Sequence, residues 1–172
     1  MSLFKVPGKG EIEPYAEFGN AWHGAMQIWS QVCKRYLGRD FSMASATDGG
    51  DKECWNLTGE DRVPFDHRIV LASTFDTVMV KRENIPRLIQ AMEQYIKDFD
   101  EPGHLPAQIE KLTELVDDES CFAVCWQQTS CADTWFGYDE CPTCGHEKSR
   151  PYDVSKDEDH WFLFDDVVNG VD

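Results

Sequence analysis

The strongest constraint on the fold is an amphipathic pattern between Asn84 and Phe99. Apolar residues recur there every three or four positions, the spacing that places side chains on one face of an α-helix. Pro86 stands near the start, where a helix tolerates proline, and a Pro-Gly pair follows the end. The pattern therefore predicts a helix over 84–99 that buries one face. The apolar positions are Ile85, Leu88, Ile89, Met92, Ile96 and Phe99.

The same reasoning predicts two further helices. Over 20–37, apolar residues follow Asn20, a good N-cap, at helical spacing, and Gly38 stands where glycine commonly ends a helix. The other helix begins at Pro106 and ends near Val116.

Strands are expected where β-branched and aromatic residues run together or alternate with polar ones. The expected ranges are 67–82, 121–129, 135–138 and 160–164. The first 19 residues contain prolines and glycines and should form an extended or loop lead-in. Residues 39–67 show no period, and such a long irregular stretch is either functional or contains a short element.

The order helix, strands, helix, helix, strands favours an α+β fold over a regular parallel βαβ sheet. We expect about three helices packed on a small, mostly antiparallel sheet. At 172 residues the chain is one domain by default, so 1–172 is predicted to be a single domain.

The formal net charge of −16 restricts the partners. Nucleic acid and anionic membranes are disfavoured as direct ligands, because a phosphate backbone would be repelled. A basic protein or a cation is the natural complement, although an acidic surface can also serve solubility alone. No apolar run is long enough for a membrane span, and the first residues lack the apolar core of a signal peptide. Seven cysteines in such a chain predict a cytoplasmic protein with reduced thiols, some of them bound to metal.

One local motif carries chemistry: CPTCGH, from Cys141 to His146. Two residues between the thiols let both sulfur atoms reach one ion, Pro142 stiffens the turn, and Gly145 tolerates a positive φ. The motif resembles the metal-binding knuckle of zinc ribbons. The resemblance implies a zinc-knuckle-like C-terminal segment within a cysteine-rich subregion over 121–150, and Zn²⁺ as a structural cofactor.

A tetrahedral zinc site needs two ligands besides Cys141 and Cys144. Pairing Cys121 with Cys125 has a ribbon-like spacing, but on a regular strand their Cα atoms would lie about 13 Å apart. Cys131 avoids this objection, so the preferred set is Cys125, Cys131, Cys141 and Cys144, with Cys121, His146 and His160 as the other candidates. Buried or free thiols without metal remain an alternative. A thioredoxin-like role is disfavoured, because no helix pattern follows the motif.

Three function hypotheses follow. The first is a small acidic binding or regulatory protein, braced by structural zinc, that docks on a basic, nucleic-acid-handling protein. Small acidic inhibitors from phage or toxin–antitoxin pairs act in this way. The second is an enzyme of an unrecognised family with its site near the 39–67 loop. The third is a structural accessory protein, such as an assembly component. Residues that would line the enzyme site are Trp55, Asp61, Asp66 and His67.

Overall fold

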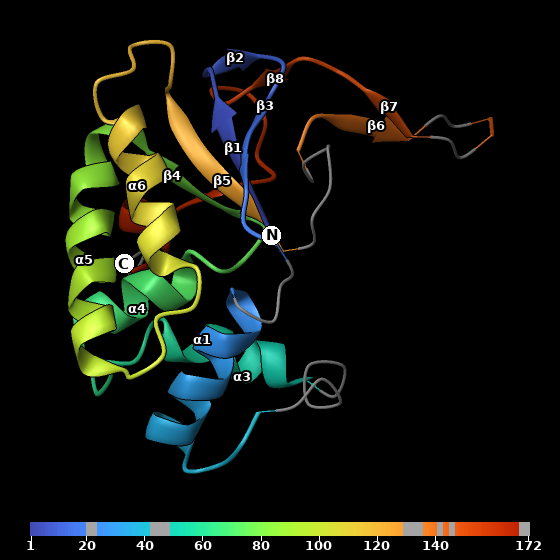
Figure 1. Ribbon diagram of the computed structural model, residues 1–172. Helices are drawn as coiled ribbons and strands as arrows, with labels where there is room; N and C mark the ends of the chain where they lie inside the picture. The colour runs from blue at the N-terminus through green and yellow to red at the C-terminus, as the bar shows by residue number, and fades with distance from the viewer. Residues whose placement is uncertain (20–23, 42–48, 129–135, 141–142, 145–146, 169–172) are drawn as a thin grey trace.

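The computed structural model describes residues 1–19, 24–41, 49–128, 136–140, 143–144 and 147–168, and shows an α+β fold (Figure 1). A five-stranded sheet has the order β3-β1-β5-β4-β9. All its neighbouring strands pair antiparallel except β4 and β9, which are parallel. Its strands are β1 (Ser2–Val6), β3 (Glu13–Glu17), β4 (Val78–Lys81), β5 (Ala123–Gln127) and β9 (Trp161–Phe162).

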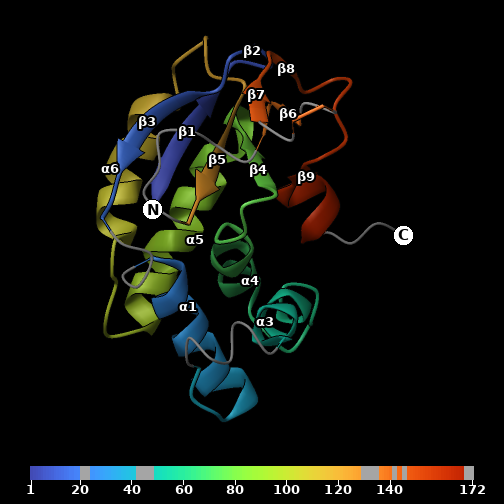
Figure 2. The same cartoon turned by 90° about the vertical axis from the view of Figure 1, so that its right-hand side faces the viewer.

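Two small two-stranded sheets accompany the main one. The first pairs β2 (Lys9–Gly10) with β8 (Tyr152–Asp153), and the second pairs β6 (Tyr138–Glu140) with β7 (Glu147–Ser149). Both lie on the side of the main sheet that faces away from the long helices (Figures 1 and 2).

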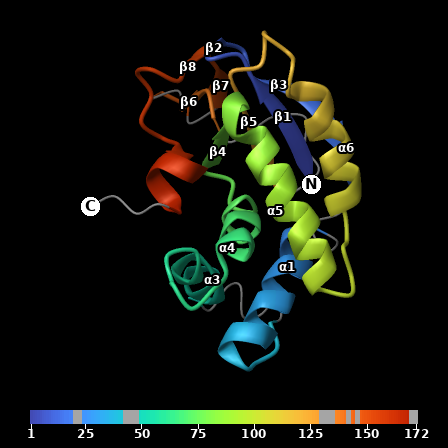
Figure 3. The same cartoon turned by 90° about the vertical axis from the view of Figure 1, so that its left-hand side faces the viewer.

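The two longest helices, α5 (Ile85–Asp98) and α6 (Leu105–Leu115), cover one face of the sheet (Figure 3). Three shorter α-helices pack beyond one end of the sheet and extend the larger core. They are α1 (Ala25–Val32), α3 (Asp51–Leu57) and α4 (Phe65–Ala72). The π-helix η2 (Cys33–Leu37) continues α1, a 3₁₀ turn η4 (Arg82–Asn84) precedes α5, and a π-helix η5 (Leu163–Val167) follows β9.

Alternation along the strands divides the apolar side chains between two cores. Leu3, Val124 and Trp126 point into the large core beneath the helices. Phe4 and Cys125 point to the other face, into a smaller core that Tyr152 and Val154 complete. The sheet is thus covered on both faces.

Several predicted elements are confirmed. The helices expected over 84–99 and 106–116 are α5 and α6, and the one expected over 20–37 contains α1 and η2. Gly38 adopts the left-handed conformation, with φ of 67°, at the end of η2. The α+β class and the mostly antiparallel sheet are confirmed as well.

The predicted strand over 67–82 is wrong in its first half. Residues Phe65–Ala72 form α4, and only Val78–Lys81 is a strand. Ile69, Val70, Leu71 and Ala72 are all fully buried, so the second half of α4 has apolar residues on every side. Such a run cannot be distinguished from a buried strand by periodicity. Pro64 marks its start, since the Pro64 carbonyl accepts hydrogen bonds from the next turn.

Two other expectations need correction. The described part of 39–67 contains α3 and the start of α4, so the described residues hold five α-helices rather than about three. The N-terminal lead-in contains β1, which lies between β3 and β5 inside the sheet. Because β1 is covered on both faces, its side chains lack the alternation that marks a surface strand. In the described part of the chain, every helix is too short or too polar to cross a membrane.

Candidate functional site

The cysteine motif lies at a β-hairpin. Antiparallel pairing aligns Glu140 of β6 with Glu147 of β7, and the six residues that connect this pair are those of CPTCGH. The hairpin projects away from the main sheet (Figure 1). Cys144 is exposed. Cys141, Pro142, Gly145 and His146 lie outside the described residues, so the zinc knuckle stays a prediction.

The other cysteines with described positions are buried in the body of the protein. Cys125 lies in the smaller core, whereas Cys121 lies in the larger one and donates a hydrogen bond to the Ala123 carbonyl over 3.3 Å. Burial raises the pKa of Cys121 to about 11, which keeps the thiol neutral. Because Cys121 and Cys125 belong to different cores, a pairing of these two on one ion is disfavoured.

The four predicted zinc ligands are not all placed. Cys131 and Cys141 lie outside the described residues, while Cys125 is buried in the sheet and Cys144 is exposed on the hairpin. The part of the chain that the structure describes contains no cluster of three or more His, Cys, Asp or Glu suited to a metal. The set Cys125, Cys131, Cys141 and Cys144 therefore stays a prediction.

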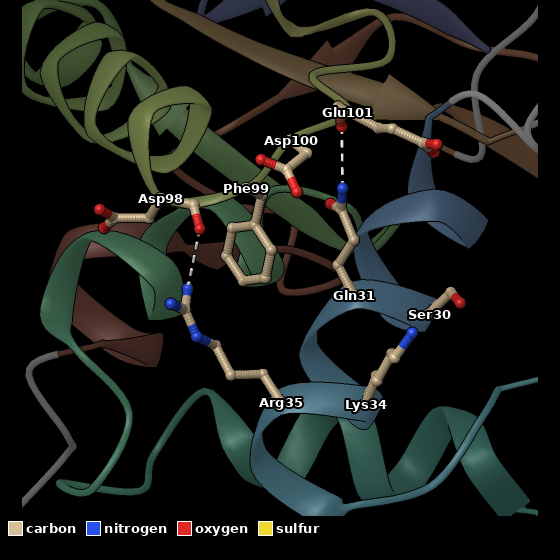
Figure 4. Close-up of a pocket in the computed structure, with 8 residues that line it drawn as sticks. All are labelled: Ser30, Gln31, Lys34, Arg35, Asp98, Phe99, Asp100 and Glu101. Atoms are coloured by element: carbon tan, nitrogen blue, oxygen red, sulfur yellow. Dashed lines mark hydrogen bonds between the residues drawn. The ribbon is translucent and has the colours of Figure 1, made fainter.

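A cleft of about 400 Å³ lies where α1 and η2 face the end of α5 (Figure 4). The Arg35 guanidinium lies 4.6 Å from the centre of the Phe99 ring and donates to the Asp98 carbonyl over 3.2 Å. On the opposite side of the cleft, the Gln31 amide donates to the Glu101 carbonyl over 2.8 Å. These polar side chains of α1 and η2 bond to carbonyl groups at and just after the end of α5. They therefore hold the two sides of the cleft together. The remaining lining residues are Ser30, Lys34 and Asp100.

Beside this cleft, His67 connects three elements. Its Nδ1 lies 2.5 Å from the Tyr36 hydroxyl and its Nε2 lies 2.9 Å from an Asp98 carboxylate oxygen. The hydrogen bond from His67, with a second from Gln94, lowers the pKa of Asp98. His67 is only 2% exposed and both ring nitrogens are engaged, so neither remains for a substrate. We interpret this trio as a structural bridge between η2, α4 and α5.

The four residues named for an enzyme site near 39–67 do not meet at the described cleft, and residues 42–48 of that segment lie outside the described part of the chain. Trp55 packs edge-on against Phe75 with ring centres 4.9 Å apart, and Asp61 is exposed, 3.7 Å from Arg68. Asp66 lies in the first turn of α4, and His67 is the buried bridge. None of these four residues lines the neighbouring cleft. The described part of 39–67 builds α3 and the start of α4, which extend the core.

A surface that the sequence did not predict gathers carboxylates from distant segments. We call it the acidic edge. β3 is an edge strand of the sheet, and α6 lies beside it (Figures 2 and 3). The Tyr15 hydroxyl donates to Glu114 over 2.6 Å and so joins the two elements. The acids of this edge, all exposed or half-buried, are Glu13, Glu17, Glu110, Glu114, Asp117, Asp118 and Glu119.

Two lysines lie within the acidic edge. Lys5 is 3.5 Å from both Glu13 and Asp118, and Lys111 is 2.7 Å from Glu114. Partial burial opposes the charge on Lys5, but Asp118 and Glu13 raise its pKa overall. Burial and the hydrogen bond to Glu114 raise the pKa of Tyr15 to about 12, so its phenol continues to donate at neutral pH. Seven carboxylates against two lysines leave this surface strongly negative.

The acids near the C-terminus, which form the densest acidic stretch of the sequence, are compensated in part, whereas Glu158 and Asp159 are exposed. Asp166 accepts a hydrogen bond from the Phe162 amide over 2.6 Å. Three other aspartates face cations, and the pairs are Asp153 with Lys9 and Lys156, Asp157 with Arg150, and Asp165 with Lys81. The acidic edge is therefore the stronger candidate for an electrostatic interface. No protein-family model, no curated protein and no solved structure matches this chain significantly.

Proposed function

We propose that this chain is a binding or regulatory protein whose acidic edge docks on a basic surface of a partner protein. The observation that carries the proposal is the gathering of seven carboxylates and only two lysines on one surface made by β3, α6 and residues 117–119. Arginine and lysine side chains that hold phosphates also bind carboxylates. The expected partner is therefore a protein that handles nucleic acid, and the chain would inhibit it by occupying its phosphate-binding groove.

Four of the seven acids of the acidic edge, Glu13, Glu17, Glu110 and Glu114, lie on β3 and α6, and this regular structure favours binding. β3 is fixed by its pairing with β1, and α6 packs against α5 over the sheet. Glu110 and Glu114 are one helical turn apart, or about 6 Å along the helix axis. Since the backbone that carries these acids is already ordered, docking costs little backbone entropy.

We further propose that a structural Zn²⁺ braces the β6–β7 hairpin. The support is the position of CPTCGH between the paired residues Glu140 and Glu147. Cys141 and Cys144 would supply two thiolates at the tip, with Cys125 and Cys131 as the predicted remaining ligands. A closed site of four thiolates stabilises a fold and leaves no open position for catalysis.

The test uses two variants with the same change in net charge. The edge variant carries four neutralising substitutions that leave the Tyr15–Glu114 bond intact, and the control variant carries four at exposed acids elsewhere. Basic partners retained by the wild type are identified, and their affinities are measured at several salt concentrations. The edge substitutions are Glu13→Gln, Glu17→Gln, Glu110→Gln and Asp117→Asn, and the control substitutions are Asp40→Asn, Asp51→Asn, Asp61→Asn and Glu83→Gln.

We expect the edge variant to bind a purified partner roughly tenfold more weakly or worse, and the control variant to bind like the wild type. Binding should weaken as salt rises, and DNA should compete with the chain for the partner. Equal loss in both variants, or affinity independent of salt, would contradict the proposal. A stable homo-oligomer in light scattering, without a basic partner, would instead favour a structural accessory protein.

A further inference from the structure

A second surface, independent of the acidic edge, has the opposite charge. A groove of about 750 Å³ lies at the end of the sheet where β1 and β4 end and β5 begins. We call it the lysine–aromatic groove. Two phenylalanines and three lysines give it its character, namely Phe122, Phe162, Lys9, Lys81 and Lys156.

The aromatic part of the groove is exposed but held in place. Phe122 is 44% exposed, although its amide donates to the Val6 carbonyl and its carbonyl accepts from the Arg82 amide, both over 2.8 Å. Its ring lies edge to face with that of Phe162, with centres 6.4 Å apart. Gly8 lets the backbone pass close by, since a Cβ there would lie 3.2 Å from two carbons of the Phe122 side chain. An apolar ring is thus presented to solvent on a fixed backbone.

The charged part of the groove is net positive within a chain of net charge −16. Lys9 and Lys156 both pair with Asp153, each 3.6 Å from the same carboxylate oxygen. The other carboxylate oxygen of Asp153 accepts hydrogen bonds from the amide and hydroxyl of Ser155, which fixes the turn. Lys81 lies 4.4 Å from the centre of the Phe162 ring and is paired with Asp165, so the excess positive charge comes from Lys9 and Lys156. Two lysines that share one aspartate leave a positive charge for a ligand.

We propose that the lysine–aromatic groove binds a small organic anion with a planar aromatic body, an aryl or heteroaryl phosphate or carboxylate. The ring of the ligand would stack on Phe122, and its anionic group would lie between Lys9 and Lys156. The volume is in the usual range for small-ligand pockets, about 300–1,000 Å³. Neither the exposed Phe122 ring nor the lysine pair alone specifies this ligand. Together they do, because one groove then offers a stacking surface for an aromatic ring and positive charges for an anion.

In the first test the full chain is titrated with 1-naphthyl phosphate. Binding is measured by calorimetry and by the NMR chemical shifts of the backbone amides. Inorganic phosphate supplies the anion without the ring, and 1-naphthylmethanol supplies the ring without the charge. We expect saturable binding of 1-naphthyl phosphate, with shifts at Phe122 and Phe162, and roughly tenfold or more weaker binding of each partial probe. A parallel titration with 2-naphthoate compares a carboxylate with the phosphate of 1-naphthyl phosphate. The compound that binds more tightly shows which anionic group the groove prefers.

The second test uses variants. Phe122→Leu keeps an apolar side chain but removes the ring, and Lys9→Gln with Lys156→Gln removes the rim charges. Each should weaken binding of 1-naphthyl phosphate roughly tenfold. The matched control, Lys52→Gln with Lys97→Gln, removes two exposed lysines outside the groove and should leave the affinity unchanged.

Three results would overturn the proposal. One is the absence of saturable binding of 1-naphthyl phosphate at millimolar concentration. Another is binding that the groove variants do not weaken. The third is tighter binding of a glutamate-rich peptide with a single tryptophan, which would assign the groove to an acidic protein segment instead.

Discussion

Replacing Asp76 with asparagine should stabilise the protein at pH 7 and leave its stability nearly unchanged near pH 4. Asp76 lies between α4 and β4 and is largely buried; one carboxylate oxygen accepts from the Gln128 amide over 2.9 Å and the other from the Gln127 side chain over 3.3 Å. Burial raises the pKa of Asp76 to about 6, even though the hydrogen bond from the Gln128 backbone amide acts to lower it. An asparagine side chain at this position would keep an oxygen for the Gln128 amide and would carry no charge.

The magnitude follows from linkage between proton binding and folding. In the unfolded chain an aspartate has a pKa of about 3.9, so between about pH 4 and pH 6 the unfolded state loses its proton before the folded state does. The folded state binds more protons in this window, and stability falls as pH rises through it. A shift of about two units at about 1.36 kcal/mol per unit corresponds to about 2–3 kcal/mol. For a chain of this size, that is a change in Tm of about 4–10 °C.

The assay is thermal unfolding of wild type and Asp76→Asn at pH 4 and pH 7.5. The variant should have the higher Tm at pH 7.5, and this advantage should shrink to nearly zero at pH 4. Asp61→Asn removes an exposed carboxylate and should change the free energy of unfolding by no more than about 0.5 kcal/mol at either pH. An advantage of equal size at both pH values would refute the argument, because it would show that burial does not penalise the charge on Asp76.

Three further predictions test the metal site, the core and the groove. Elemental analysis should find one zinc per chain in the wild type and none in Cys141→Ser. Absence of metal from both proteins would contradict the zinc site and favour cysteines that bind no metal. In the wild type the Trp126 indole donates to the buried Gln108 side-chain oxygen over 3.0 Å. Trp126→Phe removes this donor and should lower the free energy of unfolding by about 1–3 kcal/mol. Adding Gln108→Leu should recover part of this loss; no recovery would point to packing alone. Gly8→Ala should cost about 1–2 kcal/mol in denaturant unfolding, because Gly8 has a φ of 80° and faces Phe122; an unchanged midpoint would contradict this.

The sequence alone predicted the elements whose environment has two different sides. α5 and α6 each bury one face against the sheet and expose the other, so their apolar residues repeat with the helical period. Elements that are buried on more than one side left no such pattern. β1 lies between two strands, and its side chains enter the larger core on one face and the smaller core on the other. The buried run Ile69–Leu71 of α4 has the apolar sequence of a buried strand. In both cases only the tertiary structure shows which neighbours bury the element.

The surfaces depended on tertiary structure for a similar reason. Composition established that the chain is acidic, and the sequence located the densest acids near the C-terminus. Three of those acids, Asp153, Asp157 and Asp165, face the cations Lys9, Lys81, Arg150 and Lys156. Pairing of β1 with both β3 and β5 brings β3 beside α6, where Tyr15 meets Glu114, and brings Glu13 beside Asp118, about a hundred positions later in the chain, with Lys5 between them. Charge adds up along a sequence, whereas a binding surface depends on which charges the fold places side by side, and only long-range strand pairing decides that.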